Sequence, residues 1–187
     1  MLNLHYKEDL KCVLENVGLD GSILDNPAGR TINPGHSIEN SWFLMNLAML
    51  NNDKDLLQKA LNILDWSLDI GWDKQYGGIY YFRDVYGRPC EQLEHDMKLW
   101  WPHNEILIAS LMAYRDTKDE YYLDKFKICL DYCKTYFSDS EYGEWYGYLR
   151  RDGKPTEPAC KGSTFKGPFH LPRMLIMIDT MIDEIIR

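Results

Sequence analysis

The feature that most constrains this sequence is a histidine that recurs at a fixed interval. His36, His103 and His170 are separated by two equal intervals of 67 residues (103 − 36 and 170 − 103). Each histidine precedes a run of apolar residues at helical spacing and follows a segment rich in glycine and proline. A fixed period of this length is typical of folds built from repeated supersecondary units. The sequence therefore predicts three copies of one unit.

A β-hairpin is the second feature that the units are expected to share. Segments 76–89 and 142–155 read YGGIYYFRDVYGRP and YGEWYGYLRRDGKP. Apolar residues that alternate with polar ones and are interrupted by a glycine turn favour a hairpin. Residues 20–34 hold a weaker version of the pattern. We therefore expect one hairpin ahead of each histidine.

Helical patterns follow the histidines. Asp53 is placed to cap a helix that stops at Gly71, Asp119 begins another, and Pro102 suits a first helical position. We expect helices over residues 36–50, 53–71, 100–114, 119–137 and 170–186. The first helix of each unit is apolar nearly all round, which is typical of a buried helix, whereas the second carries more charge.

This contrast predicts an all-α fold in which an inner ring of helices lies within an outer ring. In such an α/α toroid the short β-hairpins gather at one end and the histidines face a common mouth. A closed (α/α)6 barrel has six helix pairs, so residues 1–187 are expected to form a single partial domain, half of that barrel, from three units of about 67 residues. A half ring leaves an apolar flank on its inner helices, which proteins rarely expose. Either another chain covers it, a second copy in a homodimer or a complementary N-terminal half, or the sequence is a fragment.

Composition excludes several classes of partner. A formal net charge of −8 argues against nucleic acid and against an anionic membrane surface. No apolar run approaches the roughly 20 residues of a membrane span, and the first residues lack the layout of a secretory signal. We expect a cytoplasmic protein whose five cysteines are free thiols.

The candidate functional residues gather around the three histidines. His36 and Glu39 share a helix face, and Gly35 before them would let a ligand approach the backbone. Each histidine alone fits a structural role better than a catalytic one. Together, acids, bases and aromatic rings at one end of an apolar ring predict an active site. Two histidines on opposite sides of a cavity suit removal of a proton from one face of a carbon and its return to the other. No metal-ligand set is present.

Four strings around these residues carry a further indication. They read GRTINPGHSIE, DMKLWWPHNE, EYGEWYGYLRRDGK and FKGPFHLPR. In this order and spacing they resemble the N-acylglucosamine 2-epimerase (renin-binding protein) family, from about Leu4 to the end of the chain. The family has an (α/α)6 barrel and interconverts N-acetylglucosamine and N-acetylmannosamine at C2.

The resemblance implies roles for individual residues. His36 and His170 would be the acid/base pair, supported by the carboxylates Glu39 and Glu105. The residues expected to bind the substrate are His103, Trp101, Trp42 and Arg173. The sugar would open to its aldehyde, one histidine would remove the C2 proton, and the other would reprotonate the opposite face. No metal or redox cofactor is required.

The resemblance covers only the carboxy-terminal half of the family. ATP is an activator in the family, but the region linked to it and an active-site arginine belong to the half that has no counterpart here. Two alternatives stay open: an inactive fragment or sugar-binding or association module, and an enzyme acting on mannose or cellobiose-type sugars. The intact His36, Glu39, Glu105 and His170 speak against decay, and the WWPH form favours the N-acylglucosamine branch.

Overall fold

The computed structural model describes residues 1–187. The helices are α1 (Pro34–Asn51), α2 (Lys54–Gly71), α3 (Trp100–Thr117), α4 (Glu120–Tyr132), which a π-helical turn (Cys133–Phe137) extends, and α5 (His170–Ile186). The strands are β1 (Tyr6–Lys7), β2 (Cys12–Val13), β3 (Thr31–Ile32), β4 (Arg83–Asp84), β5 (Lys98–Leu99) and β6 (Tyr148–Leu149).

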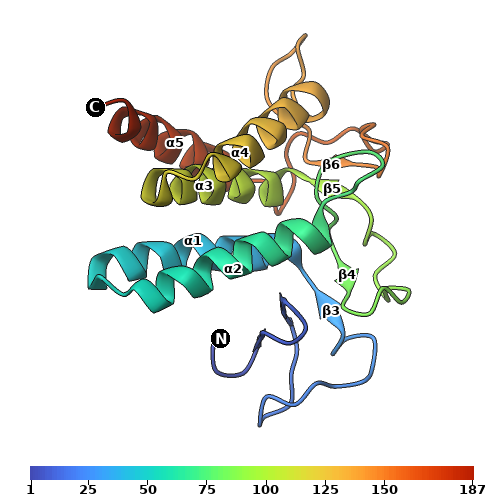
Figure 1. Ribbon diagram of the computed structural model, residues 1–187. Coiled ribbons are helices and arrows are strands. Elements are labelled where there is room, and N and C mark those ends of the chain that lie inside the picture. Colours follow the sequence, from blue (N-terminus) through green and yellow to red (C-terminus); the bar gives the residue numbers. More distant parts are fainter.

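The helices form two layers, as the repeat predicts. α1, α3 and α5 pack side by side in an inner row, α2 packs on α1, and α4 packs on α3 (Figure 1). β3, β4, β5, β6 and the long loops next to them lie at one end of the helices, whereas β1 and β2 pack beside α2 (Figure 1). α3 occupies the centre of the inner row, and every residue from Trp100 to Ala113 is buried. The predicted inner and outer helices are therefore confirmed.

The helix starts follow the predicted capping chemistry with one exception. Asp53 caps α2 by accepting a hydrogen bond from the Leu56 N–H (2.9 Å), and Asp119 caps α4 through the Tyr121 N–H (3.0 Å). Pro102 was expected at a first helical position, but it is the third residue of α3. A proline is accepted there because the first N–H groups of a helix have no partner within the helix.

The strand pairing differs from the predicted hairpins. β3 pairs with β4 and β5 pairs with β6, both antiparallel. The strand before α1 or α3 thus pairs with the strand that follows the next outer helix, α2 or α4. Segment 20–34 supplies only β3, and segment 76–89 supplies β4. In segment 142–155 a bridge between Leu149 and Pro155 keeps a local turn. Alternating apolar and polar residues indicate an extended, half-buried segment, but they do not indicate which strand it pairs with. The β3–β4 and β5–β6 pairs were therefore not predicted.

The two edges of the inner row leave apolar side chains exposed. On α1 these are Phe43, Leu47, Met49 and Leu50, and on α5 they are Leu175, Ile176, Ile182 and Ile186. α3, which has a neighbour on either side, exposes no large apolar side chain. The predicted unpaired flank is therefore present at both edges. None of the helices combines the length and apolarity needed to cross a bilayer.

Candidate active site

A cavity of about 560 Å³ opens at the strand end of the molecule, where the inner helices begin. Its volume is in the range of small-molecule binding sites. The residues that line it are His36, Tyr81, Glu94, Met97, Leu99, Trp100, Trp101, Tyr148, Phe165 and His170. The first and third repeat histidines therefore face one cavity, although they are separated by more than a hundred residues of sequence.

Trp101 lies against both histidines. Its ring centroid is 5.1 Å from that of His36 and 5.5 Å from that of His170. Gly35 leaves room for the Trp101 ring, because a Cβ at residue 35 would lie 2.6 Å from Cη2 of that ring. The expectation that Gly35 admits a ligand is therefore wrong: the missing side chain makes room for Trp101. The indole also remains in the cavity wall, as expected of a substrate-binding residue.

His36 is held by a carboxylate from outside the helical repeat. Its Nδ1 lies 3.1 Å from Oε2 and 3.3 Å from Oε1 of Glu15. A carboxylate only accepts hydrogen bonds, so we assign a proton to Nδ1. The hydrogen bond and charge of Glu15 raise the pKa of His36 above its ordinary value, against the opposing effect of burial. Nε2 has no hydrogen-bond partner within the protein and is free for a ligand.

His170 is held in the same manner. It is the first residue of α5, and its Nδ1 lies 2.8 Å from Oε1 of Glu105. Glu105 lies on α3 with a fully buried side chain. The Nδ1 proton therefore points to Glu105, and Nε2 again has no partner within the protein. Two imidazole–carboxylate pairs thus border one cavity.

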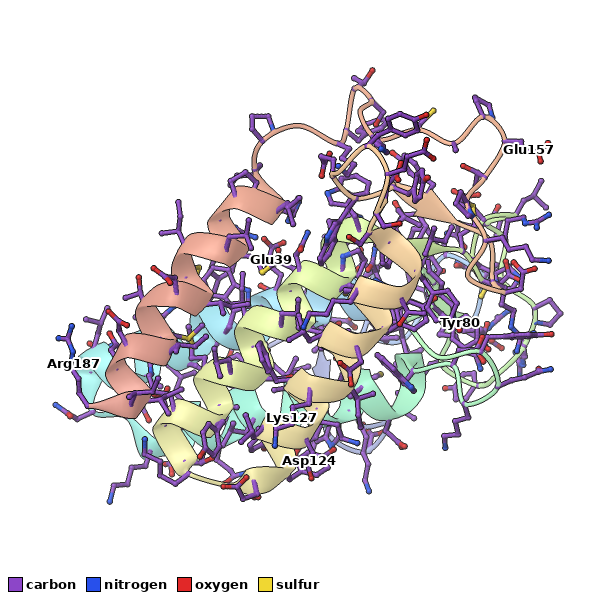
Figure 2. The ribbon with its side chains drawn as sticks, turned by 90° about the horizontal axis from the view of Figure 1, so that it is seen from above. Glu39, Tyr80, Asp124, Lys127, Glu157 and Arg187 are labelled. Atoms are coloured by element: carbon purple, nitrogen blue, oxygen red, sulfur yellow. The ribbon has the colours of Figure 1, made fainter.

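Glu105 is the centre of a larger network. Its Oε2 accepts a hydrogen bond from Nε1 of Trp42 (2.8 Å), and its Oε1 accepts one from Nη2 of Arg173 (2.5 Å). The same Arg173 nitrogen donates to Oε1 of Glu39 (2.9 Å), and Figure 2 shows Glu39 between the ribbons of α3 and α5. Trp42 and Arg173 were expected to bind substrate, but neither lines the cavity. Their polar groups bind Glu105, so they support the wall from behind.

The same network bears on metal binding. Ligand atoms of Glu39, Glu105 and His170 all lie within 4.8 Å of one another, a spacing at which they could hold an ion. The Arg173 guanidinium, however, contacts Glu39 and Glu105 and lies 3.3 Å from Nδ1 of His170. Its positive charge already balances the carboxylates. The donor set as arranged therefore fits an ion-pair network better than a metal centre.

His103 does not belong to the cavity, which corrects its predicted role in substrate binding. Its side chain is fully buried, its Nδ1 donates to the Leu99 carbonyl (2.6 Å), and its Nε2 accepts from the Ile79 N–H (3.1 Å). The ring also stacks on Tyr132. Burial lowers the pKa of His103 to about 3, so the ring is neutral. It fastens the start of α3 to the loop after α2.

Several residues of the site were missed from the sequence. Glu15 lies before the first complete unit, so the repeat gave no reason to select it, although it interrupts an apolar stretch (CVLENV). Tyr81, Tyr148 and Phe165 line the cavity from long loops. Their aromatic character was noted in the sequence, but no periodic signal indicates which loop residues point inward.

The fold and the cavity together define a class: a helical-barrel protein with two imidazole–carboxylate pairs placed for acid–base chemistry on a small ligand. The family model for N-acylglucosamine 2-epimerase (GlcNAc 2-epimerase) matches residues 4–166. The chain belongs to this family.

Individual relatives support the assignment. Mouse N-acylglucosamine 2-epimerase is 42% identical over 187 residues, which cover 98% of this chain and 44% of the relative. The bovine N-acylglucosamine 2-epimerase is 43% identical over 183 residues, which cover 97% and 43%. A cellobiose 2-epimerase structure from Bacillus thermoamylovorans superposes with a TM-score of 0.76 at 25% identity, over 96% of this chain and 43% of that one. The fold class is thus half of an (α/α)6 barrel, and the chain spans less than half the length of these relatives.

Proposed function

We propose that this chain supplies the acid–base part of a sugar 2-epimerase that interconverts N-acetylglucosamine and N-acetylmannosamine. The observation that carries the proposal is the pairing of His36 and His170 across one cavity, each with Nδ1 bound to a carboxylate. This arrangement leaves two ring nitrogens able to exchange protons with a bound ligand. Supporting it, the N-acylglucosamine 2-epimerases of mouse and cattle are 42% and 43% identical to this chain.

The chemistry follows from these two nitrogens. In the open-chain sugar, the C1 aldehyde acidifies the proton on C2. Nε2 of the neutral histidine accepts this proton, and the electron pair of the C–H bond passes into an enolate. Nε2 of the protonated histidine then returns a proton to the opposite face of C2. One proton leaves and one arrives, so nothing is oxidised or reduced. Acid–base catalysis of this kind contributes about 10²–10⁴ in rate.

The surrounding residues fit these roles. Glu15 favours the protonated form of His36, which suits a proton donor. Glu105 orients His170, and Glu39 steadies Arg173 beside it. We propose that no metal or redox cofactor takes part, because proton transfer needs none and Arg173 already balances the carboxylates. No residue of this chain is assigned to ATP.

The proposed substrate is an N-acyl amino sugar. The N-acylglucosamine 2-epimerases of mouse and cattle share 42% and 43% of residues with this chain, against 25% for the cellobiose 2-epimerase structure. We therefore favour an N-acyl amino sugar over a cellobiose-type disaccharide or mannose. Parallel assays with all three sugars separate these alternatives.

The exposed edges of the inner row bear on how the barrel is completed. The apolar side chains exposed on α1 and α5 lie at the two edges of the inner row, where the next inner helices of a closed barrel would pack. The relatives are more than twice as long as the matched region. We propose that a complementary N-terminal half covers these edges and completes the active site in the cytoplasm. A homodimer of two half barrels is the competing arrangement.

The test is proton exchange at C2. N-acetylmannosamine in D₂O is incubated with the purified chain, alone and after co-expression with the N-terminal half of the mouse relative, and deuterium at C2 is read by NMR. We expect little exchange by the chain alone and clear exchange by the pair, lost in His36→Asn and His170→Asn. Robust exchange by a monomeric chain contradicts the need for a second half. No exchange by a correctly assembled pair contradicts the function.

A further inference from the structure

Glu15 is fixed in place before α1 begins. Its N–H donates to the Thr31 carbonyl (3.1 Å), which ties the segment after β2 to strand β3. Residues on either side of this connection, Cys12, Leu14 and Ile32, form a small buried cluster. The Glu15 backbone is thus held by the same strand that leads into α1 and His36. The carboxylate therefore has a defined position relative to the imidazole.

The contact between Glu15 and His36 matches the contact between Glu105 and His170. In both, the carboxylate meets Nδ1 and leaves Nε2 without a partner within the protein. The two carboxylates differ in what else they bind. Glu105 also accepts from Trp42 and Arg173, whereas the Glu15 carboxylate has no hydrogen-bond partner other than His36. His36 is therefore the one side chain to which the Glu15 carboxylate is hydrogen bonded.

We infer that Glu15 is a positioning residue for the proposed epimerisation: it sets the tautomer, orientation and charge of His36, as Glu105 orients His170. This inference rests on the proposed function for its catalytic meaning. Without Glu15, a neutral His36 could carry its proton on Nε2, and the nitrogen facing the ligand would no longer accept a proton. The protonated form would also lose its nearest counter-charge.

Other charged or titratable groups near His36 do not replace Glu15. Glu39, on the same helix, raises the pKa of His36 only as a smaller contribution. Glu94, Tyr81, Tyr148 and His170 line the cavity that His36 faces, but none hydrogen bonds to it. Removing Glu15 is therefore expected to change the state of His36 specifically.

The experiment compares Glu15→Ala and Glu15→Gln with Glu8→Ala in the full chain. Glu8 is an exposed acid in the β1–β2 turn and serves as the charge-matched control. Imidazole ¹H–¹⁵N NMR spectra are recorded across a pH titration. We expect Glu15→Ala to lower the pKa of His36 and to move its neutral tautomer toward Nε2–H. Glu15→Gln keeps the shape without the charge, so it should lower the pKa while disturbing the fold least. Glu8→Ala should change neither.

A second measurement gives the catalytic consequence. In the assembled protein, Glu15→Ala is expected to reduce kcat about 10- to 100-fold, as for outer carboxylates that orient metal-bound histidines, and to shift the pH profile. If His36 titrates alike in Glu15→Ala, Glu8→Ala and the unaltered chain, the inference is overturned. Failure of the proposed function is a separate result, because it appears as absent C2 exchange in the unaltered assembly while the NMR titration still decides the role of Glu15.

Discussion

Nε1 of Trp42 donates a 2.8 Å hydrogen bond to Oε2 of Glu105, although the two residues lie 63 positions apart on neighbouring inner helices. This bond satisfies the one oxygen of Glu105 that neither His170 nor Arg173 contacts. A buried carboxylate is costly unless its oxygens are bonded. The packing of α1 on α3 thereby helps to fix the carboxylate that orients His170.

Replacing Trp42 by Phe tests this link. The substitution keeps an aromatic ring but leaves Oε2 of Glu105 without a donor, so we expect a loss of about 1–3 kcal/mol in the free energy of unfolding. We also expect slower C2 exchange in the assembled protein. Trp100→Phe is the matched control for stability, because Nε1 of Trp100 is buried without a partner. Equal destabilisation of the two variants in urea would show that the hydrogen bond contributes nothing.

Gly35 gives a second prediction, in which two effects oppose each other. Alanine is favoured over glycine in a helix by about 1 kcal/mol. Its Cβ, however, would lie 2.6 Å from Trp101 and 2.9 Å from Pro102, and neither can move freely in the buried start of α3. Overpacking costs about 1–3 kcal/mol. We expect Gly35→Ala to lower the melting temperature and displace Trp101 from the histidines. Gly162→Ala, with no atom within 4 Å of its added Cβ, should be neutral.

His103 predicts how stability depends on pH. Its pKa is about 3 in the folded chain, lowered from an ordinary value of 6.5. Between these values the unfolded chain binds a proton that the folded chain does not, so stability is complete above pH 6.5 and falls as pH drops toward 3. Urea unfolding at pH 7 and pH 5 measures this slope. His103→Phe should lower stability at pH 7, because the Ile79 N–H and Leu99 carbonyl lose their partner. An unchanged slope in this variant would contradict the prediction.

The sequence predicted the helices well but not the surroundings of the site residues. The 67-residue period and the caps Asp53 and Asp119 located the helices, because apolar spacing and capping are local properties of the chain. The same period made His103 look equivalent to His36 and His170. Whether a helix start faces a cavity or a neighbouring loop depends on tertiary packing, and His103 is covered by Tyr132 and the loop after α2. Glu15 was missed because it lies 21 residues before His36, ahead of the first repeat unit, and only tertiary packing brings the two side chains together.

Lys98 is the plainest case of a residue whose role the sequence concealed. It lies on β5, and its fully buried Nζ is 3.1 Å from Oδ2 of Asp73 and 3.8 Å from the Tyr80 ring centroid. Arg151 binds the same Asp73 oxygen at 2.9 Å. Isolated charges in a sequence are usually solvated. Here three of them brace the loop after α2 against β5 and the loop after β6.

This brace gives the last prediction. Asp73→Asn leaves Lys98 buried without its counter-charge, and breaking one partner of a buried pair costs about 3–5 kcal/mol. Burial has already lowered the pKa of Lys98 to about 8, so part of this cost is relieved by loss of the ammonium proton. The free energy of unfolding of Asp73→Asn should therefore rise as the pH is increased from 7 to 9.

Combining Asp73→Asn with Lys98→Met removes the buried charge, and the double variant should be more stable than Asp73→Asn alone at pH 7. Urea unfolding of the three variants, with Lys98→Met as the third, measures the coupling. Strictly additive effects would show that Asp73 and Lys98 do not act as a pair.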